Sequence, residues 1–172
     1  MGLGRAIRRI FGSSDPVVPV IRLHGVIGRV PGRRGRGLVV ADLVQPIRRA
    51  FKTPGAKAVA LLINSPGGSP VQSSLIAKRI RLMAEETELP VLAFCEDVAA
   101  SGGYWLALAG DEIYADDSSI LGSIGVVFAG FGFVEAIAKL GVDRRVHTAG
   151  ERKAILDPFE PERADDVAHL HV

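Results

Sequence analysis

The chain of 172 residues has little cysteine and no long apolar run. Its one cysteine, Cys95, excludes an intrachain disulfide framework and a cysteine-rich zinc site. No run of about 18 or more apolar residues occurs, which excludes a helix that spans a bilayer. The first residues mix charged with apolar side chains and contain no apolar segment of the signal-peptide type. We therefore expect neither a transmembrane helix nor a signal peptide, and a location in the cytoplasm or peripherally on the cytoplasmic membrane face.

The composition is 48% hydrophobic and 23% charged, which is typical of a globular protein and not of a disordered one. The length favours one domain with a sizeable core. The net charge of +2 hides an asymmetry, because residues 1–52 contain eleven Lys and Arg but two Asp and Glu. The basic excess is therefore an N-terminal property. We expect a basic tail over residues 1–16 and a single domain over residues 17–172.

Two basic stretches suggest partners only weakly. Residues Leu3 to Phe11 place three apolar side chains at helical spacing among arginines, so this segment is either a frayed basic tail or a short helix in weak peripheral contact with anionic lipid. Residues 28–37 form a loop rich in Gly and Arg without interleaved aromatic residues. Since no nucleic-acid module surrounds that loop, we predict a solvated loop and no nucleic-acid partner.

Strands and helices alternate in the predicted secondary structure. The apolar run Ala58–Ile63 is typical of a strand buried on both faces of a parallel sheet, and further strands are expected at 17–23, 90–95, 111–115 and 142–148. Helices are expected at 38–51, kinked or broken at Pro46, at 70–86, through residue 109, at 133–140 and from 161 onward. Ser69 is the expected N-cap of the 70–86 helix and Pro70 its first residue, with Leu75, Ile76, Ile80 and Met83 as its buried stripe. This order implies an α/β fold with mostly parallel, right-handed crossovers.

The Gly-rich stretch Asn64–Ser69 lies where a strand gives way to a helix. Backbone amides at a helix N-terminus lack partners and favour negative charge, and the two glycines allow a ligand to approach them. The stretch lacks the Gly-Lys-Ser/Thr ending of a P-loop and the spacing of a dinucleotide site. We interpret it as an oxyanion site with the Gly68 amide as donor, although a purely structural tight turn remains the alternative.

Small residues surround Ser101, so a substrate backbone has room to approach its hydroxyl. As a nucleophile this hydroxyl needs a base, and the candidates are Lys153 and the four histidines. Lys153 lies in a loop between a predicted strand and a predicted helix. A lysine that acts as a base near neutral pH needs its pKa lowered by about three units, roughly 4 kcal/mol. Repulsion by Arg152 and burial against Ile155 and Phe159 are candidate causes; a plain surface lysine is the alternative.

Four motifs together give a more specific signal than any one of them. They are Ile63–Ser69, Ala99–Tyr104, Gly122–Val126, and Thr148–Gly150 leading to Lys153 and Pro158-Phe159. In this order and spacing they resemble the SppA/SohB-type signal-peptide peptidases, which are Ser-Lys dyad serine proteases. The resemblance covers roughly Val17 to Phe159 and implies a ClpP/crotonase-like fold of repeated β-β-α units.

The resemblance also implies roles for individual residues. Ser101 would be the nucleophile, Lys153 the general base, Gly68 and Gly102 the oxyanion amides, and Ser123 the hydroxyl that orients the lysine. It implies hydrolysis of signal peptides or other extended apolar peptides bound by strand addition, without metal or cofactor. It further implies a homo-oligomer in which neighbouring subunits can share one site. We expect a peptidase domain truncated at its C-terminus, and the alternatives are an inactive peptide-binding subunit and a crotonase-type acyl-CoA enzyme.

Overall fold

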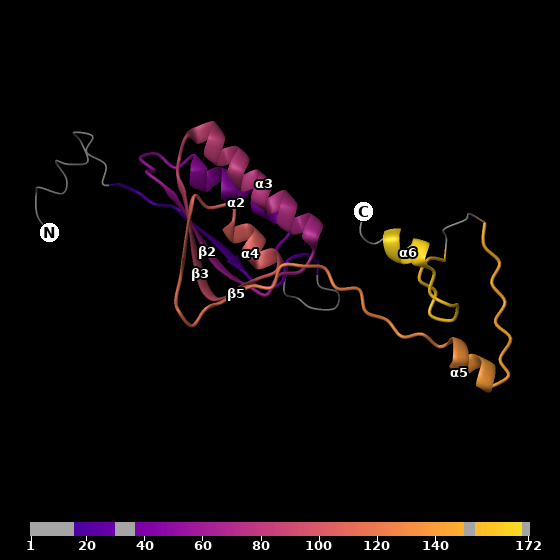
Figure 1. Cartoon of the computed structure of the whole chain (residues 1–172). Helices are drawn as coiled ribbons and strands as arrows, with labels where there is room; N and C mark the ends of the chain where they lie inside the picture. The colour runs from indigo at the N-terminus through magenta and orange to yellow at the C-terminus, as the bar shows by residue number, and fades with distance from the viewer. Residues whose placement is uncertain (1–15, 30–36, 150–153, 170–172) are drawn as a thin grey trace, which may run out of the picture. The chain divides into compact units, whose positions relative to one another are not determined.

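The computed structural model describes residues 16–29, 37–149 and 154–169. These residues form two compact units, Met1–Gly125 and Val126–Val172, and each is described by itself (Figure 1). The basic segment Leu3 to Phe11 and the proposed base Lys153 lie outside the described residues. The boundary at residue 16 and the single domain over 17–172 therefore stay predictions.

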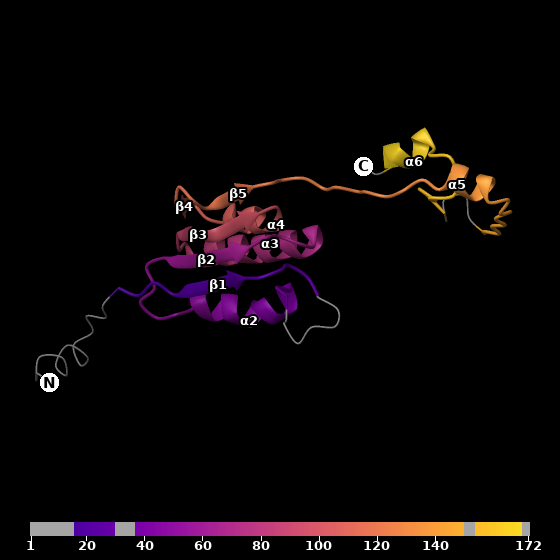
Figure 2. The same cartoon turned by 90° about the horizontal axis from the view of Figure 1, so that it is seen from below.

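A five-stranded parallel sheet organises the first unit. Four strands follow one another in the order β1 (Val20–His24), β2 (Val59–Ser65), β3 (Val91–Ala100) and β4 (Glu112–Ala115), and β5 (Ile120–Gly122) also pairs with β3 (Figure 2). All these pairings are parallel, and a helix lies in the chain between β1 and β2, between β2 and β3, and between β3 and β4. The predicted α/β fold with a mostly parallel sheet is confirmed.

Strand β3 is longer than the predicted strand at 90–95, and the extension leads to the candidate site. Its first half pairs with β4 through Leu92–Cys95, and its second half pairs with β5 through Val98–Ala100. The register with β2 shifts between Ile63 and Ser65, so that Ser65 lies opposite Ala99. The sheet therefore extends to Ala100, and Ser101 is the first residue after it.

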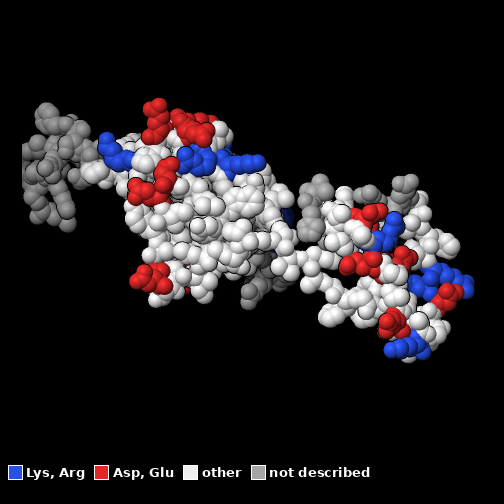
Figure 3. Space-filling view, viewed as in Figure 1, with Lys and Arg blue, Asp and Glu red and all other residues white. Residues whose placement is uncertain are grey.

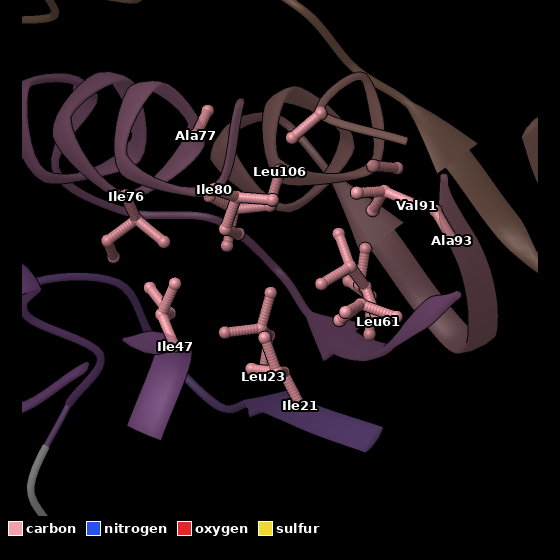
Figure 4. Packing of buried hydrophobic residues seen from close by; sticks show 14 of the residues in the cluster. Ile21, Leu23, Ile47, Leu61, Ile76, Ala77, Ile80, Val91, Ala93 and Leu106 are labelled. Carbon is pink, nitrogen blue, oxygen red and sulfur yellow. The ribbon is translucent and has the colours of Figure 1, made fainter. Parts of the chain in front are cut away.

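One apolar cluster joins the sheet to the helices α2 (Val40–Phe51), α3 (Pro70–Thr87) and α4 (Gly102–Ala107) (Figure 4). The largest members are fully buried, and burial of each such side chain stabilises the fold by about 1.5–3 kcal/mol. The strands and helices contribute to it alternately along the chain: Leu23, Ile47, Leu61, Ile76, Ile80, Val91 and Leu106. On the face of the first unit drawn in Figure 3, one group of charged side chains lies over α3, and much of the remaining surface is uncharged.

The structure excludes one of the two alternatives for α2 and corrects one expectation about α3. Helix α2 is not broken at Pro46 but continues to Phe51, because Ile47, Ala50 and Phe51 are buried behind the proline and their packing outweighs one lost backbone hydrogen bond. In α3, Leu75 is 43% exposed, whereas Ile76, Ile80 and Met83 are buried as predicted. Leu75 precedes Ile76 by one residue, which turns it about 100° away from the buried stripe.

The second unit contains the helices α5 (Val134–Lys139) and α6 (Ala164–His169) and no strand within the ranges described. The predicted strand at 142–148 is therefore wrong, since no described strand lies beside it to accept its backbone hydrogen bonds. Local contacts order this unit instead: Arg144 pairs with Asp157 at 2.6 Å, and the Phe133 N–H donates to the Pro158 carbonyl. None of the helices in the described ranges is long and apolar enough to cross a membrane.

Candidate active site

Ser101 occupies a strained turn between β3 and α4. Its backbone has φ 51° and ψ −120°, a conformation that a residue with a Cβ seldom adopts. The Ser101 N–H donates to the Gly122 carbonyl at 2.7 Å, and its own carbonyl accepts from the Trp105 N–H at 3.1 Å. Ser101 is half-buried, and it lies in the turn that joins the strand to the helix.

The Gly67–Gly68 loop after β2 lies directly against Ser101. A Cβ built on Gly67 would be 2.9 Å from the Ser101 Cβ and 2.8 Å from both the Ala100 carbonyl oxygen and the Gly102 nitrogen. Gly67 also has φ +95°, so a side chain is excluded there by crowding and by conformation. The structure thus brings together the two stretches predicted to share a site, at the carboxyl ends of the neighbouring parallel strands β2 and β3.

Ile27 holds this loop from the other side. The Ile27 N–H donates to the Gly67 carbonyl at 2.9 Å, and the Ser69 N–H donates to the Ile27 carbonyl at 2.8 Å. Gly68 lies between these two bonds with φ +146°, and a Cβ there would overlap the Ile27 backbone. Among the described residues, the N–H groups of Gly68 and Gly102 have no hydrogen-bond partner. Gly68 is exposed, whereas Gly102 is buried against the Gly67 turn.

Helix α3 begins immediately after the loop, as predicted. The Ser69 hydroxyl caps it by accepting from the Gln72 N–H at 3.4 Å, and Pro70 is the first helical residue. The positive end of this long helix therefore follows directly on Gly68 and favours negative charge in its surroundings.

Ser123 lies close to Ser101 through the backbone of β5. It follows Gly122, whose carbonyl accepts the Ser101 N–H, and it has a positive φ of 52°. Ser101 and Ser123 are therefore placed by the same strand pairing between β3 and β5. The position of Lys153 relative to both hydroxyls is outside the described residues, so its role as the base stays a prediction.

Two other titratable groups near these strands, His24 and Cys95, have surroundings that do not favour a role as base or nucleophile. His24, one of the histidines considered as a base, contacts the Glu96 carboxylate at 2.8 Å. Cys95 points into the core, and burial raises the pKa of its thiol, which disfavours the reactive thiolate. In the described part of the chain, no group of three or more His, Cys, Asp and Glu is placed to hold a metal ion.

Sequence reasoning missed two buried hydroxyls that flank the glycines. Ser65 and Ser73 are the polar residues that are buried within the described ranges, and both have an exposed fraction of 0%. Ser65 contacts Gly67 by a hydrogen bond, and Ser73 packs against Gly102. The available signal was the position of Ser65 at the end of a strand that is apolar from Val59 to Ile63, because a buried hydroxyl needs a hydrogen-bond partner.

Comparison with known proteins identifies the family to which the chain belongs. The model of peptidase family S49 matches residues 83–170, just over half of the chain. The chain therefore belongs to peptidase family S49, and its resemblance to the SppA-type signal-peptide peptidases is confirmed.

Individual relatives are much longer than this chain. It is 36% identical over 163 residues to the chloroplastic serine protease SPPA of Arabidopsis thaliana, which covers 91% of this chain and 24% of that protein. It is 54% identical over 168 residues to a protein of Brucella melitensis named Na(+)/H(+) antiporter NhaA, covering 98% of this chain and 23% of that protein. The chain thus spans about a quarter of the length of these relatives.

A solved structure supports the fold. A serine-to-alanine mutant of the 1510-N membrane-bound stomatin-specific protease superposes with a TM-score of 0.51 at 18% identity, over 69% of this chain and 52% of that one. The α/β architecture is of the ClpP-like kind, as predicted.

Proposed function

We propose that this chain carries the nucleophile and the oxyanion site of a serine endopeptidase. The observation that carries the proposal is the contact between two loops: the strained Ser101 turn packs against the Gly67–Gly68 turn, and the two unpaired amides belong to these loops. A hydroxyl beside two free N–H groups is the arrangement that acyl transfer requires, because the attack creates a negative oxygen next to the nucleophile.

The proposed reaction uses five residues of the chain. The Ser101 Oγ attacks the peptide carbonyl carbon while its proton passes to neutral Lys153, and the oxyanion accepts hydrogen bonds from Gly68 and Gly102. Collapse of the tetrahedral intermediate transfers the proton to the leaving amine and leaves an acyl-serine, which water hydrolyses. Ser123 orients the lysine amine. One oxyanion donor contributes about 2.7–4 kcal/mol in enzymes of this kind, and no metal or cofactor takes part in the proposed steps.

Substrates in this proposal are signal peptides or other extended apolar peptides with small side chains. An extended peptide can join the site by strand addition, in which its main chain supplies the hydrogen bonds. We also propose a homo-oligomer that completes the site. Exposed Trp105 and Leu108 support it, because with Leu82 they form the apolar part of a groove of about 420 Å³ between α3 and α4. Charged residues line the rest of this groove: Lys78, Arg81 and Glu85.

The test compares cleavage of a fluorogenic peptide with small apolar residues by the wild type and by Ser101→Ala, from pH 6 to pH 10. We expect activity that disappears in the variant and rises with pH as the lysine base loses its proton. Activity that survives in Ser101→Ala would reject the assignment of the nucleophile. An assembled oligomer that binds peptide without turnover would instead support an inactive peptide-binding subunit.

A further inference from the structure

Ser65 is one of the two described hydroxyls that are fully buried beside the candidate site. It is the last residue of β2, its exposed fraction is 0%, and it comes two residues before Gly67. Leaving such a group without partners costs about 1–3 kcal/mol. The contacts that satisfy this hydroxyl therefore show what the buried serine does.

The hydroxyl of Ser65 connects the end of one strand to the Gly-rich loop. Its O–H donates to the Gly25 carbonyl at 2.7 Å, and its oxygen accepts from the Gly67 N–H at 3.2 Å. Gly25 is itself fixed to the same strand, because its N–H donates to the Asn64 carbonyl at 2.9 Å. The loop is thereby attached to the rigid ends of β1 and β2.

This attachment determines which amide of the loop remains available. The Gly67 N–H points to Ser65, the Gly67 carbonyl accepts from Ile27, and the Ser69 N–H donates to Ile27. Of the three consecutive amides at 67, 68 and 69, only that of Gly68 is left without a partner among the described residues. The peptide that carries the Gly68 N–H is held by Ile27 through the Gly67 carbonyl, and Ser65 fixes the peptide before it. Because glycine has a wide choice of backbone conformations, loss of the Ser65 contact would leave the Ile27 bonds as the restraint on the orientation of the Gly68 amide.

Ser65 also contacts the second loop. A Cβ on Gly103 would lie 3.2 Å from the Ser65 Cβ and would overlap the Ser65 carbonyl oxygen. Gly103 follows Gly102, the residue that supplies the other free amide. One buried serine thus touches both loops that carry the free N–H groups.

We propose that Ser65 is a positioning residue, which fixes the Pro66–Gly67 peptide. The next peptide, which Ile27 holds by its Gly67 carbonyl, then presents the Gly68 amide to the substrate carbonyl oxygen that becomes negative during attack by Ser101. This inference rests on the proposed function. It predicts that Ser65 stabilises the transition state more than the bound substrate, because the Gly68 hydrogen bond strengthens as the oxyanion forms.

The experiment compares Ser65→Ala with Thr87→Val in the full chain, using the fluorogenic peptide. Thr87 is a matched control, because its hydroxyl also donates to a backbone carbonyl, that of Met83 at 2.7 Å, but at the opposite end of α3. We expect Ser65→Ala to lower kcat by about tenfold to a hundredfold with little change in KM, since complete loss of one oxyanion donor lowers kcat by about 10²–10³. Thr87→Val should keep the wild-type kcat.

Two further measurements separate positioning from general destabilisation. A peptide aldehyde forms an oxyanion-like adduct with a serine nucleophile, so its affinity should fall by the same factor as kcat/KM in Ser65→Ala. Ser65→Cys keeps the shape and a weak donor, and should restore part of kcat. If Ser65→Ala does not fold, the kcat of Ser65→Cys is compared with that of the wild type instead.

The outcomes distinguish this inference from the proposed function. Folded Ser65→Ala with an unchanged kcat, or with a raised KM alone, contradicts the positioning role while the protease assignment stands. An equal loss in Thr87→Val contradicts it too, because the loss would then follow stability. A wild type that neither cleaves the peptide nor binds the aldehyde contradicts the proposed function, and the role of Ser65 with it.

Discussion

Gly67 shows at the scale of one residue how the loop is constrained. It has φ +95°, and Gly25 has nearly the same φ of +96°, but a Cβ on Gly25 would meet nothing within 4 Å. Substitution by alanine at either position adds strain of about 1–3 kcal/mol from the positive φ. Only at Gly67 does the new methyl group also press on backbone atoms of Ala100 and Gly102.

We therefore expect Gly67→Ala to lower the free energy of unfolding by about 1–3 kcal/mol more than Gly25→Ala, the typical cost of overpacking. Urea unfolding followed by circular dichroism measures the difference. Equal losses in the two variants would show that the loop moves away from Ser101 without cost, contrary to the contacts described.

Some residues of the candidate site could be predicted from the sequence, and others could not. Ser101 and Gly68 were predicted because small residues around one hydroxyl, and glycines before a helix, have a chemical meaning in the sequence. The structural role of Ser65 depends on Gly25, forty residues earlier in the chain. No local pattern contains that contact, which arises only when β1 and β2 pair in register.

Asp111 joins three elements of the first unit. Its carboxylate accepts from the Val91 N–H at 2.7 Å at the start of β3, and pairs with Arg81 of α3 at 2.8 Å. The Asp111 N–H also donates to the Val91 carbonyl just before β4 begins. The Val91 hydrogen bond, followed by the Arg81 charge, lowers the pKa of Asp111 below its ordinary value.

A lowered pKa in the folded state makes stability depend on pH in a defined direction. The unfolded chain takes up a proton first, so the contribution of Asp111 is complete above about pH 4 and is lost as the pH falls through the folded-state pKa. We expect the stability of Asp111→Asn to fall less steeply between pH 5 and pH 2 than that of the wild type. Urea midpoints across this range measure it, with Asp117→Asn, an exposed aspartate, as the control. Identical slopes in wild type and Asp111→Asn would refute the linkage.

Elements with strong local patterns were predicted well, and elements that depend on distant partners were not. The apolar run before Asn64 and the stripe of Ile76, Ile80 and Met83 define β2 and α3 from the sequence alone. The extension of β3 to Ala100 requires β5 beside it, and the strand expected at 142–148 finds no described neighbour. Tertiary pairing decides these cases, because a strand is stable only when its backbone groups are bonded to another strand.

At the scale of the whole molecule, the two units differ in how many of their residues are buried. All residues of the hydrophobic core belong to the first unit, and no described residue of the second unit is buried. The second unit nevertheless exposes many large apolar side chains, among them Phe128, Phe131 and Leu140. Exposed apolar surface on this scale is typical of chains that associate. The proposed homo-oligomer raises a separate question, which is whether the subunit that supplies the serine also supplies the lysine.

A mixing experiment tests whether one site is built from two subunits. Neither Ser101→Ala nor Lys153→Ala should cleave peptide alone, since each lacks one proposed member of the dyad. If Ser101 of one subunit uses Lys153 of its neighbour around a closed ring, an equal mixture contains complete sites at about one quarter of the positions. We expect the co-expressed or co-refolded mixture to recover about that fraction of the wild-type rate.

The alternative gives a clearly different result. If both residues come from the same chain, every site in the mixture lacks either the serine or the lysine, and the mixture stays as inactive as the single variants. A double variant, Ser101→Ala with Lys153→Ala, mixed with wild type controls for subunit exchange, because under the shared arrangement it also leaves about one quarter of the sites complete. With unshared sites the same control keeps about one half, so the two mixtures together identify the arrangement, provided that size measurements show the same oligomer in both.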